Sequence, residues 1–328
     1  MSIPSISVIV AAYNAQDYIE RCLNSLKQQT LKDIEVIAVD DGSSDKTADK
    51  LDKYASEDNR FHVYHIQNGG VAHARQYALE RTTGEYVIHA DADDWLDSDM
   101  LEKLYNKAKE ENADFIMCDN VDHYPKKEII RNFNPESLEQ EVFFQNLLLI
   151  KYTSGLCHKL IRRKIFTEHN IKFDVSMTTS EDFYVLCQTF THPIRIAYVP
   201  ETYYHYDKSS NPNSITKKKI PLSHIVSQKK CIDYLETHFD KEKFKSGINH
   251  RKYVLKELMW KSHIIDKKTL LNTYPEVNSF FKKGNKDRLG FYSETFYIFN
   301  GHYHLGIFLY YYRSIKNRIK FFIKTKLS

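Results

Sequence analysis

Three aspartates in the segment Asp91–Asp94 follow an apolar, β-branched run, Tyr86–Ile88, with no lysine or arginine beside them. Such a run predicts a buried strand, which would leave the carboxylates together at its end. Crowded carboxylates repel one another, and a hard divalent cation, which prefers oxygen ligands, would relieve that repulsion. The alternative interpretation is a solvated turn before the next helix, with Asp97 or Ser98 as its N-cap. The segment alone favours neither interpretation.

Polar loops also follow the other strands that we predict in the first half of the chain. Apolar runs alternate there with segments of helical periodicity, which predicts right-handed βαβ units and a mostly parallel, Rossmann-like α/β sheet with helices on both faces. In such a sheet, ligands bind beyond the carboxyl ends of the strands. Four polar loops at one edge therefore favour a binding site. The predicted strands are Ile6–Ala12, Ile34–Val39, Phe61–Ile66, Tyr86–Ala90 and Phe115–Cys118, and the loops are Tyr13–Asn14, Asp40–Ser43, Asn68–Gly70 and Asp91–Asp94.

Several classes of protein are disfavoured by features that the sequence lacks. It has no G-x-G-x-x-G after the first strand and no G-x-x-x-x-G-K-[ST] loop, so neither an ordinary Rossmann dehydrogenase nor a P-loop NTPase is supported. The five cysteines are scattered without a close pair, which argues against a disulfide framework or a zinc knuckle and for a reducing compartment. No secretory signal precedes the first strand, and the longest uncharged run, residues 295–312, is too interrupted by polar residues to span a membrane. We therefore expect a cytoplasmic protein.

The sequence pattern changes near residue 138, and two regions are predicted. The first is a domain of residues 1–216, with halves 1–120 and 121–216, and the second is a helical, basic region of residues 217–328. In the second half of the domain we predict a helix at Val142–Ile150, a strand or helix start at Cys157–Arg163, a helix from Thr178 with Ser180 as N-cap, and strands at Ile194–Val199 and Tyr203–Tyr206.

Five short motifs stand in a fixed order along the first domain. They are Ser7–Asn14, Val39–Asp45, Gly69–Arg75, Asp91–Asp94 and Ser180–Phe183. Together they resemble a family 2 glycosyltransferase of the GT-A fold, of the type that acts in bacterial polysaccharide biosynthesis, over about residues 3–216. The resemblance implies a nucleotide-sugar-binding half followed by an acceptor half. It also implies transfer of a sugar from a nucleotide donor with inversion, with Mg²⁺ or Mn²⁺ as cofactor.

The resemblance implies that the acids after the fourth strand bind the donor. Asp93 matches the metal-binding aspartate of the family, and Asp91 matches the aspartate that faces the donor's ribose. A metal there would act as a Lewis acid on the leaving diphosphate, with phosphates and water completing its coordination shell. Arg75 is placed to contact the donor phosphates. The alternative for Arg75 is a surface arginine on an amphipathic helix.

The resemblance also implies where the nucleoside binds. Asp40 or Asp41 matches the nucleobase contact, and we favour Asp40. A carboxylate that accepts the N3–H of uracil would select uridine over cytidine, which has no such hydrogen, so a UDP-sugar is the expected donor. Ala11, Tyr13 and Asn14 match the first loop of the family, which holds the base and the ribose.

Asp182 matches the family's general base, which takes the proton of the acceptor hydroxyl as that hydroxyl attacks. The alternative is that Glu181 and Asp182 are first-turn acids favoured by the helix dipole. Glu181, Lys159 and His205 are weaker candidates for the acceptor pocket.

The two parts of the chain differ in charge. Residues 212–328 carry 24 Lys and Arg against 9 Asp and Glu, a net +15, whereas the rest of the chain carries −11. Within the tail, segment 303–328 has an apolar, aromatic stripe at helical spacing with basic residues beside it, which favours an interfacial membrane anchor. Such an anchor would suit an acceptor carried on a polyprenyl-diphosphate lipid and a peripheral place on the inner face of the plasma membrane. The alternative is a helix docked on the protein itself, and the stripe fits lipid better than nucleic acid.

Two other functions compete with the glycosyltransferase hypothesis. A sugar-phosphate nucleotidyltransferase shares the sheet architecture, but its Gly-rich basic first loop is replaced here by Tyr13–Asn14. A catalytically silent scaffold of polysaccharide assembly would not need both Asp93 and Asp182.

Overall fold

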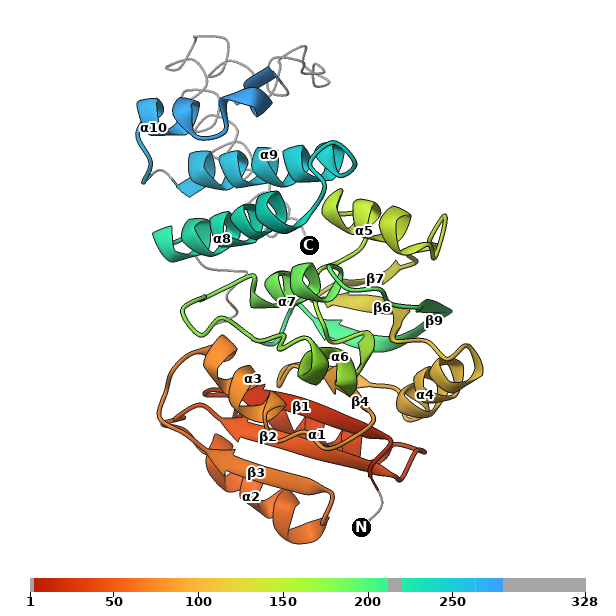
Figure 1. The fold of residues 1–328 in the computed structure, drawn as a ribbon. Helices are drawn as coiled ribbons and strands as arrows, with labels where there is room; N and C mark the ends of the chain where they lie inside the picture. The colour runs from red at the N-terminus through yellow and green to blue at the C-terminus, as the bar shows by residue number, and fades with distance from the viewer. Residues whose placement is uncertain (1–2, 212–219, 263, 280–328) are drawn as a thin grey trace.

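The computed structural model describes residues 3–211, 220–262 and 264–279, which fold around one mixed β-sheet (Figure 1). Among these residues the strand order is β3-β2-β1-β4-β8-β6-β9-β5, and β7 pairs with β6. The strands are β1 (Ile6–Ala12), β2 (Ile34–Asp40), β3 (Phe61–His65), β4 (Tyr86–His89), β5 (Trp95–Leu96), β6 (Phe115–Tyr124), β7 (Lys127–Arg131), β8 (Lys159–Arg162) and β9 (Ile196–Asp207).

Strands β1 to β4 are parallel. Strands β1, β2 and β4 are almost wholly buried because helices cover both of their faces, whereas β3 lies at the edge of the sheet and is partly exposed. Successive side chains point to opposite faces, so Ile9 joins one hydrophobic core while Val8 and Val10 join the other. Ala12 pairs with Asp40, and Ile9 pairs with His89. The carboxyl ends of β1, β2 and β4 therefore lie side by side, and the polar loops after them meet at one edge of the sheet.

Two groups of helices sandwich the sheet. Helices α1 (Ile19–Lys27), α2 (Thr47–Glu57) and α4 (Met100–Glu110) bury their apolar residues in one core. The opposite core receives α3, α5, α6 and α7, so the catalytic candidates on α3 and α7 lie on the same side of the sheet. The bounds of these four helices are α3 (Val71–Leu79), α5 (Gln140–Leu148), α6 (Arg163–Glu168) and α7 (Glu181–Thr189).

The second half of the sheet differs most from the prediction. The two strands predicted at Ile194–Val199 and Tyr203–Tyr206 are one long strand, β9, whose register against β6 shifts on either side of Asp119. Pro200 lies where the shift begins on β9, and a proline cannot donate a ladder hydrogen bond, so a bulge there is expected physically. The prediction read the interruption as a break between two strands.

The C-terminal helices pack on the α7 side of the sheet (Figure 1). They are α8 (Leu222–His238), α9 (Lys245–Ser262), α10 (Lys267–Asn272) and a short 3-10 helix, Pro275–Val277. Cys231 and Leu235 of α8 and Ile248 of α9 belong to the same core as α5 and α7. The predicted α/β sheet with a helical C-terminal part is therefore confirmed, whereas the boundary at residue 216 stays a prediction.

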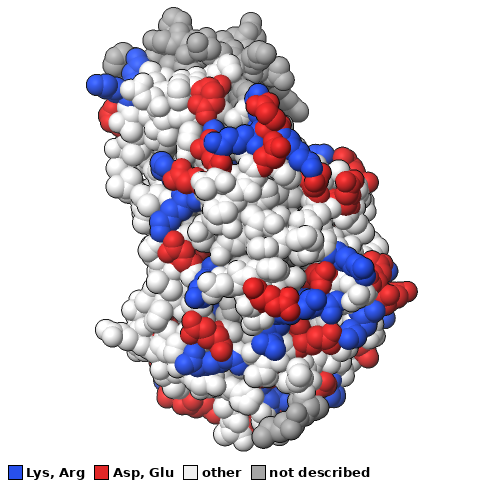
Figure 2. Space-filling view, viewed as in Figure 1, with Lys and Arg blue, Asp and Glu red and all other residues white. Residues whose placement is uncertain are grey.

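The charged surface of the described residues is mixed in sign. Figure 2 shows Lys and Arg interspersed with Asp and Glu on the displayed face, including its upper part, where α8 and α9 lie. No helix within the described residues is long and apolar enough to cross a membrane. The predicted membrane-associating segment, 303–328, lies outside the described residues.

Candidate active site

The buried guanidinium group of Arg75, on α3, brings together carboxylates from two distant parts of the chain. Its Nη2 atom donates to Oδ1 of Asp91 at 2.7 Å, and its Nη1 atom donates to Oε1 of Glu181 at 2.6 Å. Nη1 also donates to the carboxylate of Asp182. Burial acts to lower the pKa of Arg75, but the charges of Asp182, Asp91 and Glu181 raise it well above its ordinary value. The cation is therefore permanent and links the loop after β4 to the start of α7.

Asp182 lies in the first turn of α7, where its carboxyl group is poised to titrate near neutrality. Burial raises its pKa to about 7, against the lowering effect of Arg75, and the charges of Glu181 and Asp91 act in the same direction as burial. A carboxyl group with this pKa can hold or release a proton at physiological pH, as a general base must. Ser180 occupies the N-cap position, with φ of 63°, but its side chain makes no cap hydrogen bond. Its Oγ instead accepts a hydrogen bond from Nε2 of Gln228 on α8, at 2.6 Å.

The three acids after β4 have different surroundings. Asp94 is fully buried, and it accepts hydrogen bonds from the Tyr204 hydroxyl at 2.6 Å and from the Asp207 backbone N–H at 2.8 Å. Among the described residues, Asp93 accepts one side-chain hydrogen bond, from Nδ2 of Asn211 at 2.9 Å. Burial and the neighbouring charge of Asp91 raise the pKa of Asp93. Asp94 therefore has a structural role. The negative charge of Asp93 is destabilised by burial and by Asp91, and a bound cation would stabilise it.

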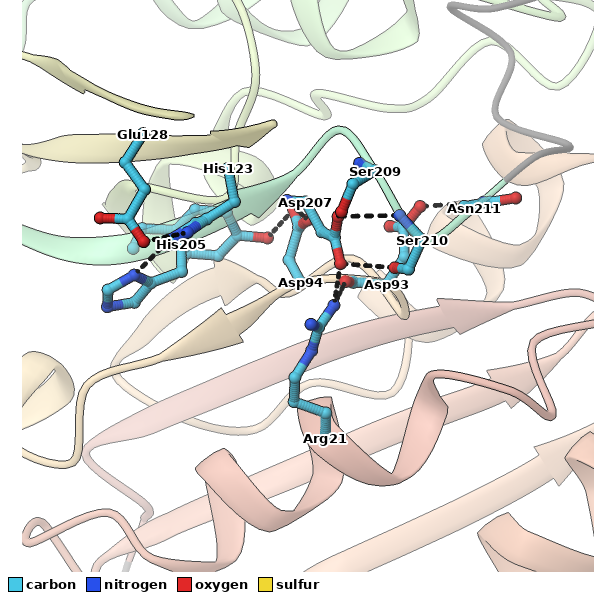
Figure 3. Close-up of polar contacts among 11 residues, drawn as sticks. Arg21, Asp93, Asp94, His123, Glu128, His205, Asp207, Ser209, Ser210 and Asn211 are labelled. Carbon is cyan, nitrogen blue, oxygen red and sulfur yellow. Dashed lines mark hydrogen bonds and ion pairs between the residues drawn. The ribbon is translucent and has the colours of Figure 1, made fainter. Parts of the chain in front are cut away.

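A second arginine, Arg21, connects Asp207 at the end of β9 to the loop Asp91–Asp94 (Figure 3). Nη2 of Arg21, on α1, donates to the backbone oxygen of Asp93 at 2.5 Å and is ion-paired with Asp207. Asp207 also accepts hydrogen bonds from Ser209 and Ser210. Although burial acts to raise the pKa of Asp207, the hydrogen bonds from Ser210, Arg21 and Ser209 hold it well below its ordinary value. Arg21 and Asp207 lie outside the five motifs, although Asp followed by serines is a recognised turn signal.

The loops after β1 and β2 are tied to each other. Asn14 has a left-handed backbone, with φ of 47°, and its Oδ1 accepts the Ser44 N–H at 2.9 Å. Its own N–H donates to Oγ of Ser43 at 2.9 Å. Tyr13 is 53% exposed at this edge, while Ala11 is partly buried beneath it. Asn14 therefore joins the loop after β1 to the loop after β2, at the edge of the sheet where Ala11 and Tyr13 also lie.

The two neighbouring acids of that loop have different partners. Asp41 accepts hydrogen bonds from the N–H groups of Gly69 and Gly70, at 2.8 and 2.9 Å. Asp40 accepts the Ser43 N–H at 3.1 Å, and its other oxygen lies 3.1 Å from Nδ1 of His65. Asp41 thus fixes the glycine loop that leads into α3, whereas Asp40 fixes the turn after β2. Both acids are only 3% exposed, and the preference for Asp40 as the nucleobase contact stays a prediction.

The acceptor-side candidates do not all come together. Glu181 joins Arg75, but His205 stacks on Trp95, with ring centroids 4.9 Å apart, and its Nδ1 lies 2.8 Å from Nε2 of His123. Lys159 is 0% exposed, which removes its ammonium group from contact with any bound molecule. The structure therefore places His205 in a cluster with Trp95 and His123, whereas Lys159 is buried near Asp182.

Comparison with known proteins gives the family. The family model described as glycosyl transferase family 2 matches residues 7–169. The chain is 33% identical over 229 residues to EpsJ of Bacillus subtilis, an uncharacterized glycosyltransferase, covering 66% of this chain and 64% of EpsJ. It is 30% identical over 235 residues to the glycosyltransferase GlyG of Streptococcus pneumoniae serotype 4, covering 66% of this chain and 75% of GlyG. The chain belongs to glycosyltransferase family 2. The predicted family and the predicted class of enzyme are thereby confirmed.

The fold of this family 2 glycosyltransferase is also that of a solved relative. The crystal structure of S. aureus TarS in complex with UDP-GlcNAc superimposes with a TM-score of 0.63 at 21% identity, over 85% of this chain and 79% of TarS residues 1–349. At this identity the likeness shows the fold alone, and it confirms the predicted GT-A architecture. Because the chain spans less than two thirds of EpsJ, the substrates of the whole protein remain to be proposed from its site.

Proposed function

We propose that this family 2 glycosyltransferase transfers a sugar, with inversion, from a UDP-sugar to a hydroxyl group of a saccharide or of a polyprenyl-diphosphate-linked saccharide in surface polysaccharide synthesis. The observation that carries the proposal is the shared guanidinium group of Arg75. It holds Asp91, the donor-side acid, and Asp182, the proposed base, on adjacent nitrogens of one side chain. A donor beside Asp91 and an acceptor beside Asp182 would therefore be neighbours, as direct transfer requires.

The donor side of the proposal uses the edge formed by the loops after β1, β2 and β4. Tyr13 and Asn14 would flank the base and ribose, with Ala11 below them, and Asp40 would accept the uracil N3–H. The solved complex of TarS with UDP-GlcNAc supports a UDP-sugar, since TarS has the same fold. Asp91 would face the ribose, and Arg75 would lie beside the diphosphate with its charge preserved at any physiological pH.

The acids after β4 fit a divalent cation of the kind that the family commonly uses. Asp93 has one carboxylate oxygen bonded to Asn211, and its pKa is raised by burial and by Asp91, so a cation would stabilise its ionised form. Among the described residues no three Asp, Glu, His or Cys side chains are grouped as a complete metal site. This suits Mg²⁺ or Mn²⁺ bound by one or two carboxylates together with donor phosphates and water. When bound, the cation would neutralise charge that develops on the departing diphosphate.

On the acceptor side, Asp182 would take the proton from the attacking hydroxyl. The neutral sugar hydroxyl is a weak nucleophile, and removal of its proton as attack proceeds lowers the barrier. Glu181 would hold Arg75 from the side opposite Asp91, which keeps the guanidinium plane fixed. The attack would come from the face of the sugar opposite the diphosphate, which gives inversion.

A screen for metal-dependent release of nucleoside diphosphate tests the proposal. The purified chain is incubated with a panel of nucleotide sugars, with Mn²⁺ or Mg²⁺ or with EDTA, and with saccharide acceptors of the surface-polysaccharide type. We expect UDP release from one UDP-sugar, loss of release in Asp182→Asn, and nearly normal release in Asp174→Asn, a substitution at an acid paired with Lys230 away from Arg75. Absence of release from every donor would refute the proposed transfer from a UDP-sugar and would favour a silent scaffold. Release of pyrophosphate from a nucleoside triphosphate and a sugar phosphate would favour a nucleotidyltransferase.

A further inference from the structure

Lys159 is a buried lysine whose side chain cannot contact a bound substrate. Burial lowers its pKa to about 7, against the raising effect of the Asp182 charge. Its side chain is 0% exposed, and its Nζ atom donates to the backbone oxygens of Thr153 at 2.9 Å and Gly155 at 2.5 Å. Nζ also lies 2.6 Å from Nε2 of His158. Burial lowers the pKa of His158 well below its ordinary value, so its ring is neutral and can accept. An ammonium group has three donors, and here three acceptors meet them.

These contacts fix a short loop that ends beside Asp182. The loop, residues 153–156, leads into β8, where Lys159 pairs with Met117 of β6. The Lys159 N–H also donates to the backbone oxygen of Leu156 at 3.0 Å. The backbone N–H of Leu156 in turn faces the Asp182 carboxylate and acts to lower its pKa. The loop is therefore held at one end by the sheet and at the other by the Lys159 ammonium group.

We propose that Lys159 is a positioning residue for the base: by holding the backbone of residues 153–155 it aims the Leu156 N–H at Asp182, and in its protonated form it places a positive charge near that carboxylate. This inference rests on the proposed function, in which Asp182 is the base, and it replaces the predicted contact between Lys159 and an acceptor. Lys159 touches neither substrate nor reacting atoms.

The charges around Asp182 determine the direction in which its pKa should move when Lys159 is replaced. The groups that face Asp182 are Arg75 from α3, Asp91 from the loop after β4, Glu181 from its own helix, and Lys159 and the Cys157 thiol from β8 and the loop before it. Arg75 is always charged and Lys159 is charged in its protonated form, and both charges stabilise the carboxylate. Loss of the Lys159 charge and of the aimed N–H would leave Arg75 as the one cation among them, and the pKa of Asp182 would rise.

The test compares two buried lysines. Lys159→Met removes the ammonium group at similar volume, and Lys256→Met is the matched control. Lys256 is likewise 0% exposed and donates to backbone oxygens, those of Leu271, Thr273 and Tyr274, in the C-terminal helices. Both substitutions should lower the melting temperature. Lys159→Gln, which retains two N–H donors, serves if the Met variant does not fold.

For Lys159→Met we expect kcat to fall by about 10- to 100-fold, the loss expected when a catalytic group is misplaced, with little change in the donor KM. The acid limb of the kcat–pH profile should move to higher pH, and Lys256→Met should leave both quantities unchanged. A ¹³C-aspartate NMR titration, assigned with Asp182→Asn, should show the same upward shift of the Asp182 pKa without any donor.

An unchanged Asp182 titration in Lys159→Met, or equal losses of kcat in both lysine variants, would overturn the inference. If the wild type transfers no sugar, the proposed function fails, while the NMR titration still decides the role of Lys159.

Discussion

Arg75 and Asp182 form a buried ion pair between helices α3 and α7, although 107 residues separate them in the chain. The pair is part of a larger arrangement, because the same guanidinium group binds Asp91 at 2.7 Å. A fixed cation between two acids keeps them close without letting them repel each other. This arrangement makes Arg75 the residue whose replacement should disturb both sides of the proposed reaction.

Replacing Arg75 by lysine should abolish most activity although the charge is retained. Lysine is a point charge and cannot present two nitrogens to Asp91 and Asp182 in the fixed plane of a guanidinium group. We expect kcat/KM to fall by about 10²-fold or more, the scale of loss seen when catalytic groups are misplaced. Arg81→Lys is the control, since Arg81 near the end of α3 binds the backbone oxygen of Tyr77. Similar kinetics in the two variants would contradict a bridging role for Arg75.

The rate should depend on the ionisation of Asp182. A general base works in its deprotonated form, and the pKa of Asp182 is about 7, so kcat should rise with pH through about 7 and level off above it. Steady-state rates from pH 5.5 to 9, at saturating donor and metal, measure this limb. Asp182→Asn should remove the limb together with about 10²- to 10⁴-fold of the rate, the usual contribution of a general base. A profile that is flat between pH 6 and 8 would argue against Asp182 as the base.

The raised pKa of Asp182 should also cost stability at high pH. In the unfolded chain its carboxyl group titrates near the ordinary value of 3.8, so between pH 4 and 7 the folded state binds more protons than the unfolded state. Stability from this group is therefore lost as pH rises through that window and stays lost above it. Asp182→Asn, which cannot ionise, should melt higher than the wild type, by a margin that grows from pH 5 to pH 8 to about 2 °C or more. Melting curves at the two pH values test this, and a margin that shrinks with rising pH would contradict it.

Divalent cation should bind at Asp93 and should need the donor phosphates. We expect Mn²⁺ to bind weakly to the free chain and more tightly with UDP, because few protein carboxylates are available and phosphate oxygens complete the shell. Electron paramagnetic resonance of Mn²⁺ with and without UDP measures this directly. Asp93→Asn should weaken the UDP-dependent binding, whereas Asp97→Asn, at a partly exposed acid that contacts His205, should not. Binding that is indifferent to Asp93 would place the cation elsewhere.

The fold of the first half could be predicted because its information is local. Strands β1, β2 and β4 are buried on both faces, so each is largely an apolar run, and the helices between them carry an apolar stripe at helical spacing. Loops at the ends of parallel strands converge by geometry alone. That rule alone predicts that Asn14, Asp40 and Asp91 lie at one edge of the sheet.

The contacts of the second half depend on partners that no local pattern links. Arg21 and Asp207 are 186 residues apart, and their pairing follows from the way that α1 and β9 lie against the loop after β4. Lys159 could be found as a cation near the motifs, but its burial depends on the packing of the 153–158 loop. Strand β5 has two residues and strand β7 is largely exposed, so neither carries an apolar run long enough to predict.

Replacing Tyr204 by phenylalanine should destabilise the loop after β4 without removing any proposed catalytic group. The Tyr204 hydroxyl donates to Oδ2 of the fully buried Asp94 at 2.6 Å and accepts the backbone N–H of Asp91 at 3.2 Å. Its loss leaves two buried polar groups short of a partner, which costs about 1–3 kcal/mol for each unsatisfied group. Urea denaturation should therefore show a clear loss of unfolding free energy in Tyr204→Phe.

The control is Tyr203→Phe, which removes a hydroxyl that contacts the exposed Glu201. It should change the free energy of unfolding by less than about 0.5 kcal/mol, as is usual for surface substitutions. Equal effects of the two substitutions would mean that Asp94 does not depend on this hydrogen bond.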